Sequence, residues 1–475
     1  MSDTGLQPAL LGRAGEVTTL KWVVLDDPRP VKILWLFGGL GIGKTSVLMN
    51  LRRDLESHVS WVEYEPSARG LPSDLALYKA YWHCGTALVF VCEDCDELSE
   101  TVEALLSAME RRAEILGEGM HPPASVLLVT SRRQPPAISS LPNLLVLKMP
   151  VGPLREDDTL AMLRTRIGSS LHPLTEARLL ELTAGYPAFI NIVADAIRPA
   201  IGLSEQSASP ELVDRVMFDA LRHPFFRRLW HSLNVMEKSV LVTVATWADR
   251  RGGWATLSDI QTELQNHVGH LVARTIFPRV LISDPDDVQR QVQWMQTGRE
   301  RLNALKETLA RLNGKIQAIQ RGGGLGNRSI DAHAARDLLR AERRLQELLD
   351  AVPAFGQRVL ERLDKVPAQE VYNAFARFQP ERYLLEILQM IQSPLVAQAL
   401  RRSPAYSQIR EEEQALFHQL DAWNPVRGEG LDIVLHDLSA QSLIICSDGK
   451  YRILPQLLHR WLLDNLSELA EALWR

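Results

Sequence analysis

Runs of apolar residues divide the first part of the chain into candidate β-strands of a buried sheet. Three of them stand out: VKILWLF before position 38, TALVFVC ending at Cys92, and ASVLLVTS ending at Ser131. Each run is short and almost wholly apolar, which favours strands that are covered on both faces. We therefore expect an α/β core with a parallel sheet over residues 1–150.

Beyond this core, apolar residues recur with helical spacing. PLREDDTLAMLRTRI and LTEARLLELTAGYPAFINIVADAI predict a small helical lid over residues 151–222. VMEKSVLVTVATWA and TLSDIQTEL predict the beginning of a winged-helix module over 223–290. Within 366–475, a helix, a hairpin with its turn at Asp448-Gly449 and a closing helix predict either the other half of that module or a second one. We favour two separate winged helices.

Residues 291–365 carry the most regular pattern of the chain. Apolar residues alternate three and four positions apart in two runs on either side of RGGGLGNRS. This is the spacing of a heptad seam, so we expect two helices of about 20 residues in an antiparallel coiled-coil hairpin. The first run comprises Leu302, Leu305, Leu309, Leu312, Ile316 and Ile319, and the second comprises Leu338, Ala341, Leu345, Leu348 and Val352.

Composition narrows the classes of function. The 475 residues are 46% hydrophobic and 23% charged with a net charge of -5, the balance of an ordinary soluble globular protein. Because no run of about 18 apolar residues and no hydrophobic leader occurs, we expect a cytoplasmic protein without membrane association. Arginines are in excess on the predicted hairpin, but no aromatic residues interleave with them, so DNA is an open yet disfavoured partner.

The chemistry centres on FGGLGIGKTS, residues 37–46. The spacing of Gly38, Gly43, Lys44 and Thr45 fits the phosphate-binding pattern G-x-x-x-x-G-K-[ST], here between a predicted strand and a helix. Such glycines let successive N–H groups face an anion, while Lys44 reaches the outer phosphates and Thr45 binds Mg²⁺. We expect ATP or ADP with Mg²⁺ to bind here. The predicted nucleotide-binding residues of the loop are Gly38, Gly39, Leu40, Gly41, Ile42, Gly43, Lys44, Thr45 and Ser46.

Polar groups follow the two other predicted strands. After the second strand, Glu93 or Asp94 is expected to hold Mg²⁺, and Asp96 or Glu97 to orient the attacking water. Which acid takes which role stays open at this point. After the third strand, Arg132 is placed to sense the γ-phosphate, although pairing with surface acids is an alternative. Together with the loop lysine, Glu93, Asp94, Asp96 and Arg132 are the catalytic candidates.

The order of LLGRAGEV, GGLGIGKTS, FVCEDCDEL, LLVTSR and AGYPAFI resembles the STAND class of P-loop ATPases, which includes the NACHT and NB-ARC switch proteins. The resemblance covers roughly residues 9 to 200. It implies contributions to the adenine pocket from Gly12, Arg13 and Glu16, and an approach of the lid to the nucleotide at Gly185 and Pro187.

By the same resemblance, the chain is expected to be an ATP-dependent molecular switch. At Glu93 it departs from the family, which usually has Asp there, so slow hydrolysis is expected. No repeat of 20–50 residues and no appended catalytic module is visible in the sequence. We therefore expect that the change between the two states of the switch acts on a protein partner, either an effector or a sensor, or on a homo-oligomer. Two alternatives remain: a DNA-associated ATPase resembling origin-recognition or transposition regulators, and a nucleotide-bound scaffold that does not hydrolyse ATP.

Overall fold

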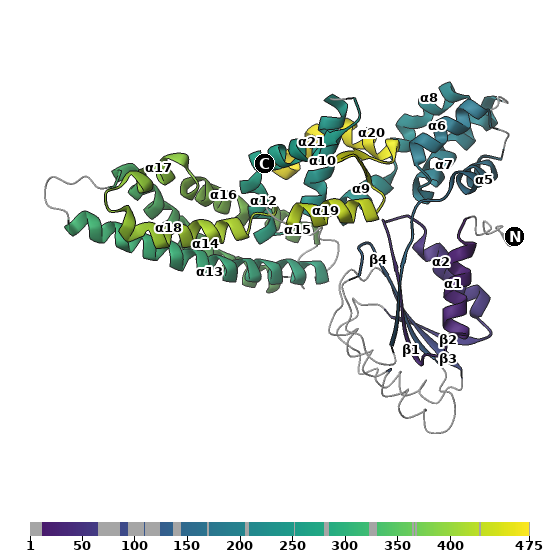
Figure 1. Cartoon of the computed structure of the whole chain (residues 1–475), viewed down its shortest axis with the longest axis horizontal. Coiled ribbons are helices and arrows are strands. Elements are labelled where there is room, and N and C mark those ends of the chain that lie inside the picture. The colour runs from purple at the N-terminus through teal and green to yellow at the C-terminus, as the bar shows by residue number, and fades with distance from the viewer. Residues whose placement is uncertain are drawn as a thin grey trace. The chain divides into compact units, whose positions relative to one another are not determined.

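The chain forms two compact units (Figure 1). The first, here called the sheet unit, contains Met1–Leu229, Gly252–Trp254 and Leu435–Asp464. The second, the helical unit, contains Trp230–Arg251, Ala255–Val434 and Asn465–Arg475. The structure is a computed structural model and describes residues 12–64, 86–93, 109, 124–135, 144–168, 171–204, 209–250, 252–279, 285–322, 330–362, 365, 368–426 and 429–474.

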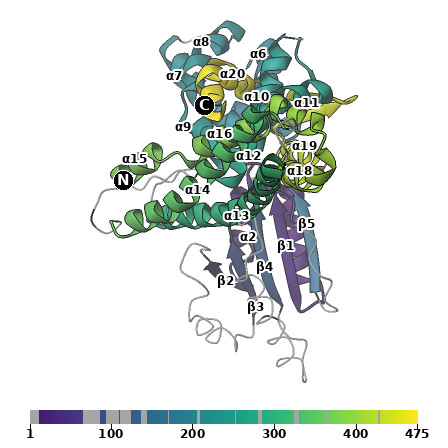
Figure 2. The same cartoon turned by 90° about the vertical axis from the view of Figure 1, so that its left-hand side faces the viewer.

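A five-stranded parallel sheet in the order β2-β3-β4-β1-β5 is the base of the sheet unit (Figure 2). In register, Phe37 at the end of β1 lies opposite Ser131 of β4 and Pro150 of β5, so the carboxyl ends of these strands meet at one edge. This sheet confirms the predicted parallel α/β core. Its strands are β1 (Val31–Phe37), β2 (Val59–Tyr64), β3 (Ala87–Cys92), β4 (Ser125–Ser131) and β5 (Leu144–Pro150).

Strand β1, which lies between β4 and β5, is buried along its whole length. On one face, Ile33 and Trp35 belong to an apolar core that also contains residues of β3 and β4. On the other face lie α1 (Ala14–Leu25) and α2 (Lys44–Leu55), which pack together. Lys32 is fully buried, and its Nζ donates hydrogen bonds to the carbonyls of Val23 at 2.6 Å and Asp27 at 2.8 Å. A buried lysine therefore fixes the end of α1 to the sheet.

The predicted lid is helical. Two residues with positive φ, Ala184 at 48° and Gly185 at 73°, end one helix of the lid, and Pro187 begins the next. This tight turn determines which lid residues meet the nucleotide loop described below. The lid helices are α5 (Glu156–Ile167), α6 (Pro173–Thr183), α7 (Pro187–Ser204) and α8 (Pro210–Leu221), followed by α9 (Pro224–Ser232).

Residues 435–464, here called the C-terminal segment, complete the sheet unit. They comprise the last part of α19 (Glu429–Ala440), β7 (Ile444–Ser447), β8 (Lys450–Ile453) and α20 (Gln456–Asp464). The predicted hairpin turn at Asp448-Gly449 is present, with both residues at positive φ. Trp461 stacks on Phe226 with ring centroids 5.6 Å apart, and Arg460 lies 3.7 Å from Asp214 of the lid. The segment therefore packs on the lid.

In the helical unit, α13 (Pro285–Gly322) and α14 (Ala332–Leu360) form the predicted hairpin, and both helices are longer than the expected 20 residues. The seam residues Leu309 and Leu345 are fully buried. Their core is shared with α16, α17 and α18, so the hairpin is part of a helical bundle and does not project alone. The other elements of this unit are α10 (Val235–Arg250), β6 (Ala255–Thr256), α11 (Leu257–Asn266), α12 (Val268–Ile276), α15 (Ala368–Arg377), α16 (Pro380–Ile391), α17 (Pro394–Arg402), α18 (Tyr406–Ala422) and α21 (Leu466–Trp474).

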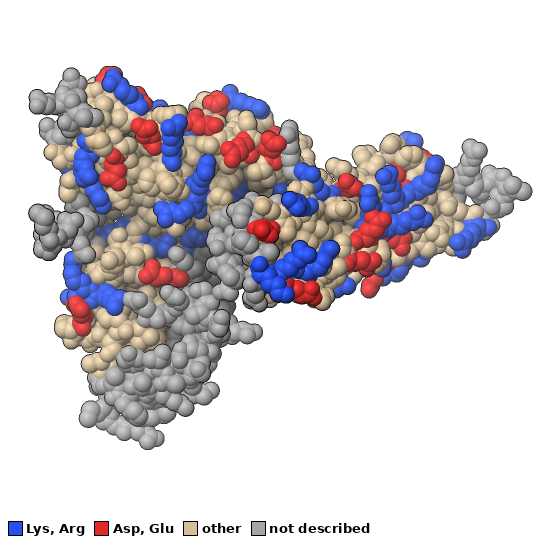
Figure 3. Space-filling view, turned by 180° about the vertical axis from the view of Figure 1, so that it is seen from behind, with Lys and Arg blue, Asp and Glu red and all other residues tan. Residues whose placement is uncertain are grey.

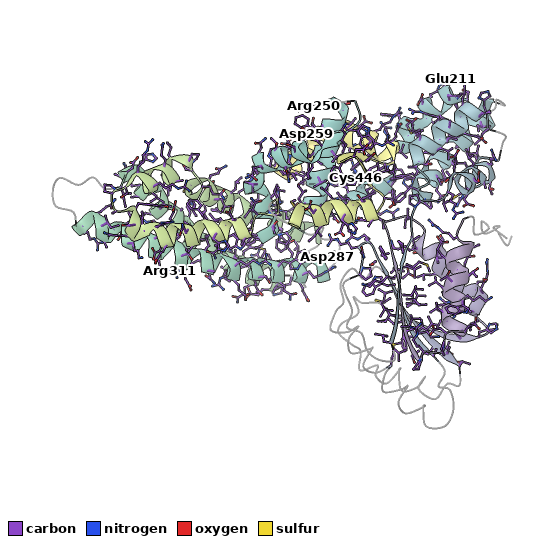
Figure 4. The ribbon with its side chains drawn as sticks, viewed as in Figure 1. Glu211, Arg250, Asp259, Asp287, Arg311 and Cys446 are labelled. Carbon is purple, nitrogen blue, oxygen red and sulfur yellow. The ribbon has the colours of Figure 1, made fainter. Side chains whose placement is uncertain are left out.

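The two helices predicted at the start of the winged-helix module are α10 and α11. At the start of α11, Thr256 and Asp259 form a capping box, in which each side chain accepts a hydrogen bond from the backbone N–H of the other residue. Figure 4 labels Asp259. The winged-helix assignment itself stays a prediction. Among the helices in the described ranges, none combines the length and the apolar character that a membrane span requires.

Candidate nucleotide site

The loop between β1 and α2 has the backbone of an anion cradle. Gly41 and Gly43 have φ of 79° and 103°, a region that side chains disfavour, and Gly43 is the N-cap of α2. Such a turn directs the free N–H groups of the first helical turn toward a bound anion. Lys44 is only 6% exposed, and its Nζ donates to the carbonyls of Gly38 at 2.7 Å and Gly39 at 3.1 Å. The lysine charge is therefore fixed beside the cradle.

A predicted metal site lies next to this loop. Thr45 Oγ1 donates a hydrogen bond to Glu93 Oε2 over 3.1 Å. Glu93 follows β3, and the parallel register aligns the ends of β3, β4 and β1 along one edge of the sheet. Hydroxyl and carboxylate oxygens are ligands that Mg²⁺ accepts, so the pair fits the ion chemically. The structure thus brings together Thr45 and Glu93, whereas Asp94 and Asp96 lie outside the described residues.

The end of β4 is tied to the phosphate loop. Trp35 Nε1 donates to Ser131 Oγ over 2.7 Å, and this hydroxyl donates to the carbonyl of Arg133 over 2.7 Å. The Ser131 carbonyl accepts a hydrogen bond from Gly38 N at 3.1 Å. Ser131 is therefore a structural residue that sets the course of the chain after β4. Arg132 follows it, half-buried, and its role as a sensor of the γ-phosphate stays a prediction.

Arg13, which the resemblance assigns to the adenine pocket, is bonded to protein in the structure. Its Nη2 donates to the carbonyl of Ile42 at 2.9 Å and to that of Gly152 at 2.5 Å, and its Nη1 pairs with Glu16 at 2.9 Å. The side chain is almost fully buried. Arg13 therefore braces the phosphate loop against Gly152, two residues after the end of β5. Gly12, the preceding residue, has a positive φ of 71°.

The lid turn meets the loop directly. Ala188 N donates a hydrogen bond to the carbonyl of Gly41 over 3.2 Å. The ring of Pro187 is within van der Waals reach of Gly43, 3.7 Å from the place of a Cβ on that glycine. Pro187 therefore lies beside the loop, and its approach to a bound nucleotide stays a prediction. Of the other predicted loop residues, Ile42 is buried, Leu40 half-buried and Ser46 exposed.

Sequence reasoning missed the contribution of the C-terminal segment. His436 Nε2 lies 3.1 Å from Gln134 Oε1, and Asp437 pairs with Arg133 at 3.9 Å. The first pair joins residues 302 positions apart. Gln134 and Arg133 come directly after Arg132, so the segment contacts the chain beside the predicted γ-phosphate sensor. No local pattern predicts such a long-range pair.

Comparison with known proteins finds solved structures that are similar to part of this chain. No protein-family model matches the chain, and no curated protein matches it. The chain is similar to a Drosophila ORC structure bound to DNA, with 13% identity over 62% of this chain and 80% of that one and a TM-score of 0.33. For Cdc6p from Pyrobaculum aerophilum the identity is 16%, over 56% and 82% of the two chains, with a TM-score of 0.30.

A Walker-type ATPase of Pyrococcus abyssi has 11% identity, over 54% of this chain and 84% of that one, with a TM-score of 0.35. TM-scores this low do not identify a fold, so the fold is assigned from the strands, loop and helices of this chain. Its parallel sheet, its glycine loop between β1 and α2, and its helical lid together form a P-loop NTPase core.

Proposed function

We propose that the chain is an ATP-binding and slowly hydrolysing molecular switch whose C-terminal segment responds to the bound nucleotide. The observation that carries this proposal is that Asp437 and His436 contact Arg133 and Gln134, the residues directly after Arg132. If Arg132 moves when the γ-phosphate is present or lost, the neighbouring contacts move with it. The segment then has two arrangements whose balance depends on the nucleotide.

Different groups of the chain would contact the phosphates and the metal ion. Lys44 would neutralise phosphate charge and the α2 N-terminus would donate hydrogen bonds to the phosphates. Thr45 and Glu93 would hold Mg²⁺, which would neutralise the charge that develops during phosphoryl transfer. Glu93 has a longer side chain than the Asp usual in the resembled class, which supports slow turnover. A differential affinity of a few kcal/mol between the two arrangements is enough to shift the population.

The surface of the helical unit supports a protein partner, or another copy of this chain, over DNA. Two basic side chains of the hairpin are paired with acids: Arg344 with Glu347 at 2.8 Å, and Lys315 with Glu412 at 2.6 Å. Figure 3 shows basic and acidic side chains interspersed over the described helices of this unit, and no purely basic face appears in that view. Such a mixed surface suits a protein better than a polyphosphate backbone.

Calorimetry with Mg-ATP tests the proposal on the full chain. We expect wild type to bind and Lys44→Ala to lose at least about tenfold in affinity, since the variant removes the fixed cation of the loop. Lys21→Ala, a lysine of α1 away from the loop, is the matched control and should bind as wild type does. Equal affinity of Lys44→Ala and wild type, or no binding by wild type, would refute the nucleotide site.

A further inference from the structure

Gly39 occupies a position of the loop at which the phosphate-binding pattern does not require glycine. It is the second residue of G-x-x-x-x-G-K-[ST], where any residue is allowed. Unlike Gly41 and Gly43, it is not among the residues with positive φ, so alanine fits its backbone. Neither phosphate binding nor backbone conformation explains why this residue lacks a side chain.

Packing explains it. A Cβ on Gly39 would lie 2.0 Å from the hydroxyl of Tyr186 and 2.6 Å from the carbonyl oxygen of Gln441. Tyr186 belongs to the lid turn and Gln441 to the C-terminal segment, and both are almost fully buried. Two segments that are distant in the sequence therefore close onto one glycine of the loop. On the same residue, the carbonyl accepts a hydrogen bond from Lys44, the cation expected to touch phosphate.

The Tyr186 hydroxyl at this contact bears on how firmly the closed arrangement is held. It is buried without a hydrogen-bond partner among the described residues. Burial raises the pKa of this phenol, so it stays a protonated donor. An unsatisfied buried hydroxyl carries a cost, which makes the closed arrangement weaker than a fully bonded one.

We propose that Gly39 is the latch of the switch: the lid and the C-terminal segment hold their closed arrangement by meeting on this glycine, and displacement of the loop at Gly39 releases the segment. The inference rests on the proposed function and adds the place at which the nucleotide loop and the segment are coupled. Overpacking at such a contact shifts an opening equilibrium by roughly 5- to 150-fold.

Hydrogen exchange of the full chain, measured by mass spectrometry without nucleotide and with Mg-ADP, tests the latch. Gly39→Ala should raise the exchange rates of amides in residues 435–464 by roughly 5- to 150-fold in both states. Gly15→Ala is the matched control, because nothing lies within 4 Å of a Cβ at that helical glycine. In the double variant Gly39→Ala/Tyr186→Phe the nearest clashing atom is absent, so exchange should fall part of the way back.

Arg133→Gln gives a second approach that leaves the loop unaltered. It weakens the pair with Asp437 at a partly exposed site and should raise exchange in the same residues by a smaller factor. Wild-type exchange in residues 435–464 of both Gly39→Ala and Arg133→Gln would overturn the latch. Absence of nucleotide binding by wild type would instead refute the proposed function itself.

Discussion

Replacing Arg13 with methionine distinguishes a brace of the loop from a contact with adenine. The guanidinium donates hydrogen bonds to the carbonyls of Ile42 and Gly152 and is only 5% exposed. Methionine keeps most of the apolar stem but donates no hydrogen bond. A hydrogen bond of a charged group contributes roughly 1.5–3 kcal/mol, so the loss of two predicts a free energy of unfolding that is lower by about 3–6 kcal/mol. Nucleotide affinity should fall as well, because the loop loses its support.

Urea denaturation without nucleotide measures this effect, with the free energy of unfolding taken by linear extrapolation. Glu16→Gln is the control: it removes only the partner of a helical pair at the edge of the site, and should cost at most about 1 kcal/mol. If Arg13→Met unfolds as wild type does but binds Mg-ATP more weakly, then Arg13 acts on the ligand, and the brace is refuted.

Three further predictions follow from the same structure. Glu93→Gln should lower ATP turnover by about 100-fold and Mg-ATP affinity by less than about tenfold, measured by phosphate release and calorimetry; equal losses would contradict a role in the transition state. Burial lowers the pKa of Lys32 below the ordinary lysine value of 10.5, so the unfolded chain binds more protons than the folded chain as the pH approaches 10.5. Wild-type stability to urea should therefore rise with pH in that window, and Lys32→Met should lack this dependence. Replacing the exposed Arg321, Arg336 and Arg340 with Gln should leave any DNA affinity unchanged in an anisotropy titration; a salt slope flatter by about one unit per lost contact would promote the DNA-associated alternative.

Local sequence patterns predicted the parts of the fold that neighbouring residues determine. The three apolar runs are β1, β3 and β4, and the glycine spacing lies between β1 and α2 as expected. The heptad seam is buried in the helical hairpin. Edge strand β5 was not predicted, although LLVLKMP is also a short apolar run; its partial burial reflects its place at the edge of the sheet, which a local pattern does not give. The sharing of the seam with α16, α17 and α18 was missed because heptad spacing does not identify the partner helices.

At the candidate site, the sequence predicted the position of the glycine loop between β1 and α2, but not the long-range contacts that hold the loop in place. Thr45 and Glu93 were predicted as metal ligands, and the parallel register brings their oxygens within 3.1 Å. Arg13 was expected at the adenine, but its carbonyl partners at Ile42 and Gly152 come from segments that only the folded sheet brings together. The contact of Gln441 with the loop has the same origin. A residue type predicts which chemistry is available, whereas its partners depend on long-range packing.

The most direct test of the switch compares hydrogen exchange of residues 435–464 in wild type saturated with Mg-ADP and with a non-hydrolysable analogue of Mg-ATP. A coupling of about 1 kcal/mol between the γ-phosphate and the segment corresponds to a rate difference of about fivefold. We predict a difference of at least this size, confined to the C-terminal segment and the lid turn that meet the loop. Equal exchange in the two saturated states would contradict the account, since a segment that does not distinguish ATP from ADP cannot report hydrolysis.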